Sequence, residues 1–346
     1  MGFFNGHITP EGTYEPSTLF KFLKPKKSGN DINGLGEDKV RNPIPLLWHT
    51  PSKIQYKYIQ MLFKMNFRPR IILFHNNILR KYVSLKLKKH KLRNSTPKVA
   101  PKNETPEAFT TLVKQVANKN KVDAFGVTKL KYEWLFTSYK LPKWATKALS
   151  ENKLFLVVFA VQHDPEAFNQ APHWDFSKEI ANQYNNGSDV AVNIANYILD
   201  QGYNAYGHGG PEAGEFLLTP AAIEAGIGEL GKHGSLINPK LGGNFRLGAV
   251  YTTMPLQTDS PMVVGVDDFC QKCQVCTKAC PPKAISDGKK MVRGVKKFYV
   301  DFEKCMPYMT DNFGCGICLK VCPWSKEKVA TRLMEKYQKR MSKVEA

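Results

Sequence analysis

Apolar residues follow two different periods along this chain, and together they predict strands alternating with helices. The runs VDAFGVTKL (122–130) and LFLVVFAV (154–161) are nearly continuous and bounded by polar residues, which is typical of buried strands. Two further strands are predicted at YNAY (203–206) and FRLGAVYTTMPL (245–256). Residues 176–201 instead have helical spacing, carried by Ile180, Tyr184, Ala191, Ile194, Ala195 and Ile198.

Residues that favour helix ends support these predictions. Thr105 is expected as an N-cap with Pro106 at the first helical position, followed by apolar residues at helical spacing: Phe109, Leu112, Val113 and Val116. Thr219 with Pro220 predicts a second helix start, and Gly202 predicts a C-cap. Strands and helices are mixed without a strict βαβ repeat, which predicts an α+β fold with an α/β-like core.

Changes in composition divide the chain into three parts. Residues 1–40 are rich in Gly, Pro and Asn and are expected to be irregular, and residues 53–93 predict two basic helical segments, broken near Arg68-Pro69. Residues 95–106 carry three prolines and are expected to be a linker. The expected division is an extension and linker (1–105), a mixed domain (106–262) and a cysteine-bearing domain (263–346).

Composition places the chain among globular proteins. It has 346 residues, of which 42% are hydrophobic, and its longest strongly apolar run (154–161) is too short to span a bilayer. The N-terminal residues show neither an apolar signal core nor a twin-arginine pair, so a cytoplasmic location is expected. Disulfides are unusual in that compartment, so closely spaced cysteines indicate metal binding.

The net charge of +20 is concentrated in one region. Residues 41–103 contain no Asp or Glu, and Lys and Arg are dense among aromatic and aliphatic residues. One interpretation is a solvated basic face on packed helices. The other is a surface for anionic lipid, which would place the protein at the membrane periphery, for nucleic acid, or for an acidic electron donor. Composition does not choose among these partners.

All eight cysteines lie in the last quarter of the chain. The first four have the spacing C-x2-C-x2-C-x3-C-P, and the spacing C-x3-C-P occurs again at Cys318 and Cys322. In two-cluster ferredoxins the cysteine before Pro ligates the other cluster. This rule predicts one 4Fe–4S cluster on Cys270, Cys273, Cys276 and Cys322, and a second on Cys280, Cys305, Cys315 and Cys318. A zinc site is the alternative, but it leaves the repeated C-x3-C-P unexplained.

Longer motifs resemble the corrinoid-dependent reductive dehalogenases. The resemblance runs from about Glu107 to Ser325 and includes QGYNAYGHGG (201–210), TPAAIEAGIGELGKHGSLINPKLGGNFRLGAVYTTMPL (219–256) and the cysteine block through CPW (322–324). The epoxyqueuosine reductases of tRNA maturation share this core. The resemblance implies a nitroreductase-like corrinoid-binding catalytic domain followed by a two-cluster ferredoxin-like domain.

The resemblance also implies cofactor-binding residues. Those expected to contact cobalamin are Gly207, His208, Gly209, Gly210, Gly228, Gly231, His233, Gly234 and Thr252. Glycines permit the close backbone approach that a broad, flat corrin needs, although they also serve tight turns. Family enzymes hold cobalt without a protein histidine below it, so His208 and His233 are expected to make local or rim contacts.

The dehalogenases donate a proton from a tyrosine beside a Lys or Arg, and the matching positions here are Tyr184 and Arg246. A neighbouring cation stabilises phenolate and eases proton donation to a developing carbanion. The alternatives are that Tyr184 is a core aromatic residue and that Arg246 contacts the corrinoid.

The expected activity is reductive dehalogenation of an organohalide, with electrons passing from a low-potential donor such as ferredoxin or flavodoxin through two clusters to cobalt. One alternative is a tRNA-modifying enzyme similar to epoxyqueuosine reductase. The D-x-A-P-V-x-E motif of that family is missing, and only 24 residues follow Cys322, too few for its helical-repeat tail. The other alternative is an electron-transfer iron–sulfur protein without corrinoid.

Overall fold

A computed structural model describes residues 6–23, 28–45, 95–208, 215–312, 314–326 and 328–343. The two basic helical segments expected within 53–93 lie outside the described residues, as do Gly209 and Gly210. Most of the basic region 41–103 is therefore outside the structural description, and its role stays a prediction.

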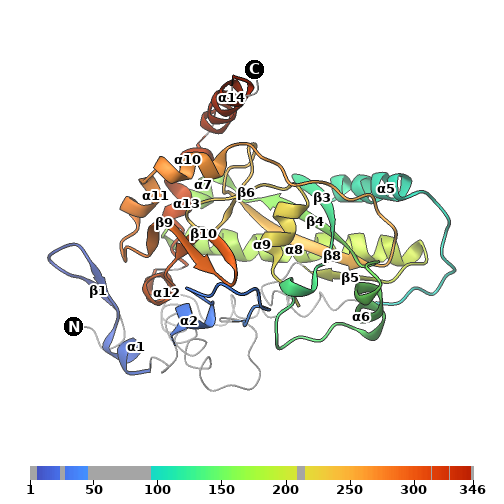
Figure 1. Ribbon diagram of the computed structural model, residues 1–346, viewed down its shortest axis with the longest axis horizontal. Coiled ribbons are helices and arrows are strands. Elements are labelled where there is room, and N and C mark those ends of the chain that lie inside the picture. The colour runs from blue at the N-terminus through green and yellow to red at the C-terminus, as the bar shows by residue number, and fades with distance from the viewer. Residues whose placement is uncertain are drawn as a thin grey trace.

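A four-stranded antiparallel sheet forms the centre of the molecule (Figure 1). Its strands lie in the order β3 (Ala124–Lys129), β4 (Phe155–Gln162), β8 (Phe245–Thr252) and β5 (Ala205–His208). The four strands predicted from the sequence are therefore confirmed. Val161 on β4 pairs with Arg246 on β8, which fixes the register where β4 ends and β8 begins.

Helices cover both faces of this sheet. Alternate β4 residues such as Val157 and Phe159 pack with α5 (Pro106–Lys119) and the long helix α8 (Trp174–Asp200). The intervening residues, such as Val158, pack with α6 (Lys143–Ser150) and α9 (Leu218–Glu224). Because both faces of β4 are buried, its sequence is a continuous apolar run. The expected mixture of helices and strands is confirmed.

Of the three predicted helix ends, the N-cap at Thr105 is confirmed, and Gly202 lies one position beyond the observed C-cap Gln201. The Thr105 side chain accepts a hydrogen bond from the Ala108 N–H at 3.2 Å, and Gly202 follows α8 with a φ of 88°. The N-cap predicted at Thr219 is wrong, because α9 begins at Leu218 with Leu217 as its cap residue. The Leu217 N–H donates to the Trp134 carbonyl at 2.9 Å, so a tertiary contact sets where this helix starts.

The cysteines lie on short elements beside the sheet. These are α10 (Val266–Lys272), α11 (Val275–Ala279), the hairpin β9 (Ile285–Val292) and β10 (Val295–Val300), α12 (Phe302–Asp311) and α13 (Ile317–Lys320). Helix α14 (Val329–Ser342) follows and projects from this end of the molecule (Figure 1). Among the described residues, no helix has the length and apolar character needed to cross a membrane.

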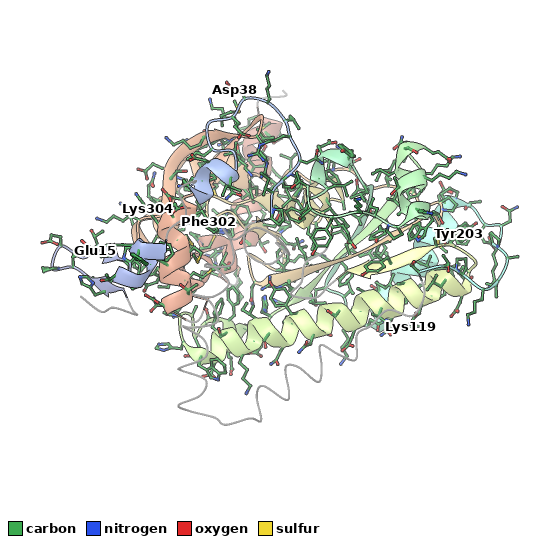
Figure 2. The ribbon with its side chains drawn as sticks, turned by 90° about the horizontal axis from the view of Figure 1, so that it is seen from below. Glu15, Asp38, Lys119, Tyr203, Phe302 and Lys304 are labelled. Atoms are coloured by element: carbon green, nitrogen blue, oxygen red, sulfur yellow. The ribbon has the colours of Figure 1, made fainter. Side chains whose placement is uncertain are left out.

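The N-terminal residues form a small arm against the cysteine-bearing end. The arm contains β1 (His7–Ile8), β2 (Tyr14–Glu15), α1 (Thr18–Leu23) and α2 (Gly29–Ile32), so the expectation of wholly irregular structure in residues 1–40 is corrected. The Tyr14 hydroxyl donates to the Asp311 carboxylate at 2.5 Å, a long-range hydrogen bond that ties the arm to α12. Figure 2 shows Glu15 of the arm beside the α12 end of the molecule.

Candidate active site and cysteine centres

Tyr184 and Arg246, the two residues expected to be catalytic, lie in direct contact. Tyr184 comes from the middle of α8 and Arg246 from the start of β8. The Arg246 Nη1 donates a hydrogen bond to the Tyr184 hydroxyl oxygen at 3.1 Å, and the guanidinium carbon lies 4.0 Å from the centre of the tyrosine ring. A hydrogen-bonding cation next to a phenol is the arrangement that stabilises phenolate.

A buried polar group, which the sequence analysis missed, lies beside this pair. His163 follows β4 and is 2% exposed, and its Nδ1 lies 3.5 Å from the Glu179 carboxylate on α8. Glu179 also accepts hydrogen bonds from the Asp164 N–H at 2.9 Å and from the Gln183 amide at 2.8 Å. The end of β4 and the helix α8 are therefore tied together near Tyr184.

The surroundings lower the pKa of both members of the His163–Glu179 pair. Burial lowers the pKa of His163 and outweighs the opposing influence of Glu179, and the charge of Arg246 adds to the lowering. Burial tends to raise the pKa of Glu179, but the nearby His163 and the hydrogen bonds from the Asp164 N–H and the Gln183 amide outweigh it, so this pKa lies below its usual value. The pair is therefore a neutral imidazole and a carboxylate at neutral pH.

Some buried polar atoms here have no partner among the described residues. They include Arg246 Nε, Asn244 Oδ1 and, in the loop after β6 (Glu229–Leu230), His233 Nε2. Burial lowers the pKa of His233 to about 4, and its Nδ1 accepts the Ser235 N–H at 3.2 Å. The neutral ring therefore carries its proton on Nε2, a donor that suits an acceptor on a bound cofactor. Unpaired buried polar atoms of both kinds fit a rim of amides such as that of a corrin.

The glycines expected at the corrinoid have structural roles in the described residues. A Cβ on Gly207 would lie 2.5 Å from the Ala191 backbone oxygen, so the absence of a side chain lets α8 approach β5 closely. Gly228 is crowded by the Ile237 backbone, Gly231 lies against the Ile237 and His233 side chains, and Gly234 has a φ of 81°. These constraints account for the glycines without a cofactor, and contact with one stays a proposal.

Thr252, the last of the residues expected to bind the corrinoid, is fully buried at the end of β8. Its hydroxyl donates to the Asn204 carbonyl at 2.7 Å and accepts the Met254 N–H at 2.9 Å. The first bond joins β8 to the segment before β5, and the second holds the turn that follows β8. The structure says nothing of the His208 side chain.

The cysteine side chains fall into two neighbourhoods. Burial raises the pKa of Cys322 to about 12, and the nearby thiols of Cys270, Cys276 and Cys273 add to the rise. Burial likewise raises the pKa of Cys305 to about 12, with further contributions from Cys315 and Cys280. Cys318 belongs with this second group, because its largest thiol contributions come from Cys315, Cys305 and Cys280. These groupings agree with the crossed ligation rule, and the ligation of a cluster by either group stays a proposal.

Clustered, largely buried thiols suit soft iron–sulfur chemistry. Among the described residues, no three His, Cys, Asp or Glu side chains converge closely enough to hold a single metal ion. A four-iron cluster is larger than one ion, so its four ligands lie farther apart. The two groups therefore fit such clusters by donor type and number.

The second group of cysteines lies close to the Tyr184 helix. Leu319 on α13 and Ile180 on α8 pack against the same buried cluster of Phe168, Ala171 and Phe176, and the Lys320 ammonium donates to the Ala171 carbonyl at 3.1 Å. Tyr184 and Arg246 thus occupy the end of the sheet that faces the cysteines.

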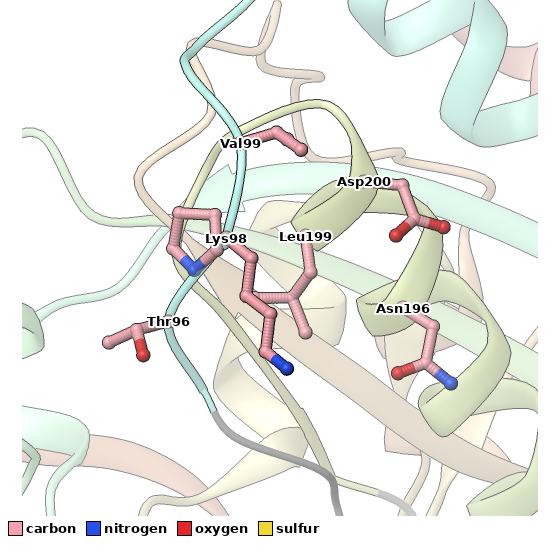
Figure 3. A pocket seen from close by; sticks show the side chains of 7 residues that line it. Thr96, Lys98, Val99, Asn196, Leu199 and Asp200 are labelled. Atoms are coloured by element: carbon pink, nitrogen blue, oxygen red, sulfur yellow. The ribbon is translucent and has the colours of Figure 1, made fainter.

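A shallow pocket at the other end of α8 is separate from this site (Figure 3). Figure 3 shows Lys98 and Val99 of the linker facing Asn196, Leu199 and Asp200. Asn196 follows Tyr184 by twelve residues, which in a helix is about 18 Å.

Comparison with known protein families identifies the type of domain at the C-terminal end of the chain. The family described as a 4Fe-4S dicluster domain matches residues 269–326, a range that contains all eight cysteines. The chain therefore carries a 4Fe–4S domain of the ferredoxin type.

The chain is related to reductive dehalogenases and also to epoxyqueuosine reductases. It is 32% identical over 219 residues to a tetrachloroethene reductive dehalogenase of Desulfitobacterium hafniense, covering 59% of this chain and 37% of the relative. It is 35% identical over 121 residues to an epoxyqueuosine reductase of Leadbetterella byssophila, covering 30% and 35%. These identities confirm the expected resemblance to both classes, and both classes are oxidoreductases.

A solved structure supports the fold. Its title is "Reductive dehalogenase structure suggests a mechanism for B12-dependent dehalogenation", and it superposes with a TM-score of 0.64 at 25% identity, over 73% of this chain and 37% of the other. The chain spans just over a third of the length of these dehalogenases.

Proposed function

We propose that this chain carries the catalytic core of an iron–sulfur and corrinoid-dependent reductase that removes halogen from an organohalide. The observation that carries the proposal is the Tyr184–Arg246 contact, joined by a 3.1 Å hydrogen bond beside the cysteine-bearing end. The proposed cluster ligands are Cys270, Cys273, Cys276 and Cys322 for one 4Fe–4S cluster, and Cys280, Cys305, Cys315 and Cys318 for the other.

Replacing halogen with hydrogen consumes two electrons and one proton and releases halide. When bound, the corrinoid supplies the electron-rich cobalt that cleaves the carbon–halogen bond. The residues proposed to hold its rim are His233, with its unpaired Nε2 donor, and Asn244, with its unpaired Oδ1 acceptor.

This chain's own contribution to the reaction is the proton. Tyr184 gives its hydroxyl proton to the carbon that has lost halide. Arg246 then stabilises the phenolate through the hydrogen bond and the guanidinium above the ring. Proton return from solvent completes the cycle, and the His163–Glu179 pair holds the surrounding elements in place.

Replacement of Tyr184 by Phe tests the proposal, because it keeps the ring and removes the proton. With tetrachloroethene as the probe, chloride release by Tyr184→Phe is expected to fall about 10²–10⁴-fold, the usual contribution of general acid catalysis. Iron and cobalamin content are expected to stay at the wild-type level.

Tyr197, on the same helix and half-buried, offers the matched control. Tyr197→Phe is expected to release chloride at the wild-type rate. If Tyr184→Phe does the same with full cofactor content, Tyr184 is not the proton donor.

Modification of tRNA is the second candidate function, favoured by the identity to epoxyqueuosine reductase. Conversion of epoxyqueuosine in tRNA, with no chloride released from organohalides, would select it instead.

A further inference from the structure

Lys232 is a buried cation that the proposed reaction does not use. It lies in the tight loop between β6 and β7 (Leu236–Ile237), closed by hydrogen bonds from the Gly231 N–H to the Ser235 carbonyl and from the Gly234 N–H to the Gly231 carbonyl. Its side chain is among the largest that are fully buried, with a residue exposure of 1%. Lysine is almost never buried to this degree unless its charge is compensated.

The surroundings of Lys232 are the first group of cysteines. Its ammonium donates to the Cys273 carbonyl at 2.9 Å and lies 5.1 Å from the centre of the Phe298 ring. Its backbone N–H donates to the Cys270 thiol. Within the described part of the chain, these contacts include no carboxylate that could balance the charge. A carbonyl and an aromatic face only partly offset the loss of water around an ammonium.

A four-iron cluster with four thiolate ligands carries net negative charge and becomes more negative when it accepts an electron. A fixed positive charge close to the cluster favours the reduced form, and net charge and hydrogen bonds to sulfur are among the features that set cluster potentials. Low effective dielectric around buried groups strengthens this attraction.

We propose that Lys232 is the built-in counter-ion of the first cluster and raises its reduction potential above that of the same cluster without the charge. The proposal rests on the cluster ligation by Cys270, Cys273, Cys276 and Cys322 given under Proposed function. It makes Lys232 a residue that tunes electron delivery rather than one that touches substrate.

Redox titration of the reconstituted protein, followed by electron paramagnetic resonance, tests the proposal without any turnover. In Lys232→Met, the reduced-to-oxidised ratio of one cluster at a fixed ambient potential is expected to fall at least about tenfold, equivalent to about 59 mV for one electron. The potential of the other cluster is expected to be unchanged, and Lys232→Arg is expected to keep the wild-type values.

Lys289 provides a matched control, because its ammonium lies 5.5 Å from the centre of the same Phe298 ring but is paired with Asp267 at 2.7 Å. Lys289→Met is expected to leave both potentials unchanged. A Lys232→Met protein with full iron content and wild-type potentials would overturn the proposal. An equal shift in Lys289→Met would also overturn it.

If Lys232→Met loses iron, the Lys232→Arg variant shows whether the missing charge or the disturbed packing is the cause. Recovery of iron and of wild-type potentials in Lys232→Arg supports the role of the charge, whereas loss of one cluster in both variants assigns Lys232 to packing and overturns the proposal. A wild-type protein that forms no 4Fe–4S cluster would refute the ligation under Proposed function itself, a result distinct from any effect of Lys232.

Discussion

At the scale of residues, three buried polar side chains lie beside the candidate centres: His163 and Glu179 near Tyr184, and Lys232 against the first group of cysteines. The resemblance placed Tyr184 beside a cation, and the structure brings Arg246 into contact with it. The His163–Glu179 pair was missed, because its members lie 16 positions apart and meet only when α8 packs against the end of β4. The burial of Lys232 could not be predicted from the sequence, since a lysine in a glycine-rich stretch such as Gly231–Gly234 is typical of an exposed turn.

The pH dependence of stability is expected to reveal the buried His163. Its folded-state pKa lies below the unfolded value of about 6.5, so the unfolded chain takes up the proton first. Stability contributed by the neutral ring is present above about pH 6.5 and is lost as the pH falls toward the folded pKa, by up to about 1.4 kcal/mol per pH unit.

Thermal unfolding at pH 7.5, 6.5 and 5.5 measures this effect. His163→Asn is expected to flatten the fall in melting temperature between pH 6.5 and 5.5. His173, an exposed histidine before α8, is the control, and His173→Asn is expected to keep the wild-type profile. Equal profiles in wild type and His163→Asn would contradict the assignment. Glu179 also contributes stability that is lost as the pH falls, but only below about 4.5, because its folded-state pKa is lowered as well.

At the scale of elements, apolar periodicity predicted the strands and long helices well. Buried strands and capped helices carry their signals locally, as the Thr105 cap does. The start of α9 could not be read in this way, because the Leu217 N–H is held by the carbonyl of Trp134, far away in the sequence. The order of strands in the sheet likewise depends on contacts that no local pattern records.

Replacement of Gly207 by Ala separates close packing from cofactor binding. A Cβ at this position would lie 2.5 Å from the Ala191 backbone oxygen, so Gly207→Ala is expected to force α8 from β5 and lower the free energy of unfolding by about 1–3 kcal/mol. Denaturant unfolding of the cofactor-free protein measures the loss.

Gly288 in β9 serves as the control, because nothing lies within 4 Å of a Cβ built there. Gly288→Ala is expected to leave the unfolding free energy nearly unchanged. If Gly207→Ala has full stability without cofactor and only loses cobalamin binding, contact with the cofactor rather than packing explains Gly207.

At the scale of the whole molecule, a helix-covered sheet and a cysteine-bearing domain meet at the end that carries Tyr184. The N-terminal arm extends the cysteine side of the molecule, since Asn30 Oδ1 accepts hydrogen bonds from the Tyr299 hydroxyl and the Phe302 N–H, both at 2.8 Å. The glycine-rich composition of residues 1–40 could not predict this docking, because the residues that bind Asn30 lie about 270 positions away in the sequence. The boundaries at 105 and 262 stay predictions.

The central claim is that one chain holds two iron–sulfur clusters and a corrinoid around Tyr184 and Arg246. Iron and cobalt analysis of the protein, reconstituted with iron, sulfide and cobalamin and then desalted, tests it most directly. The account predicts about eight iron atoms and about one cobalt per chain, following from two four-iron clusters and one corrinoid. Iron without retained cobalt would contradict the corrinoid site, and zinc in place of iron would contradict the clusters as well.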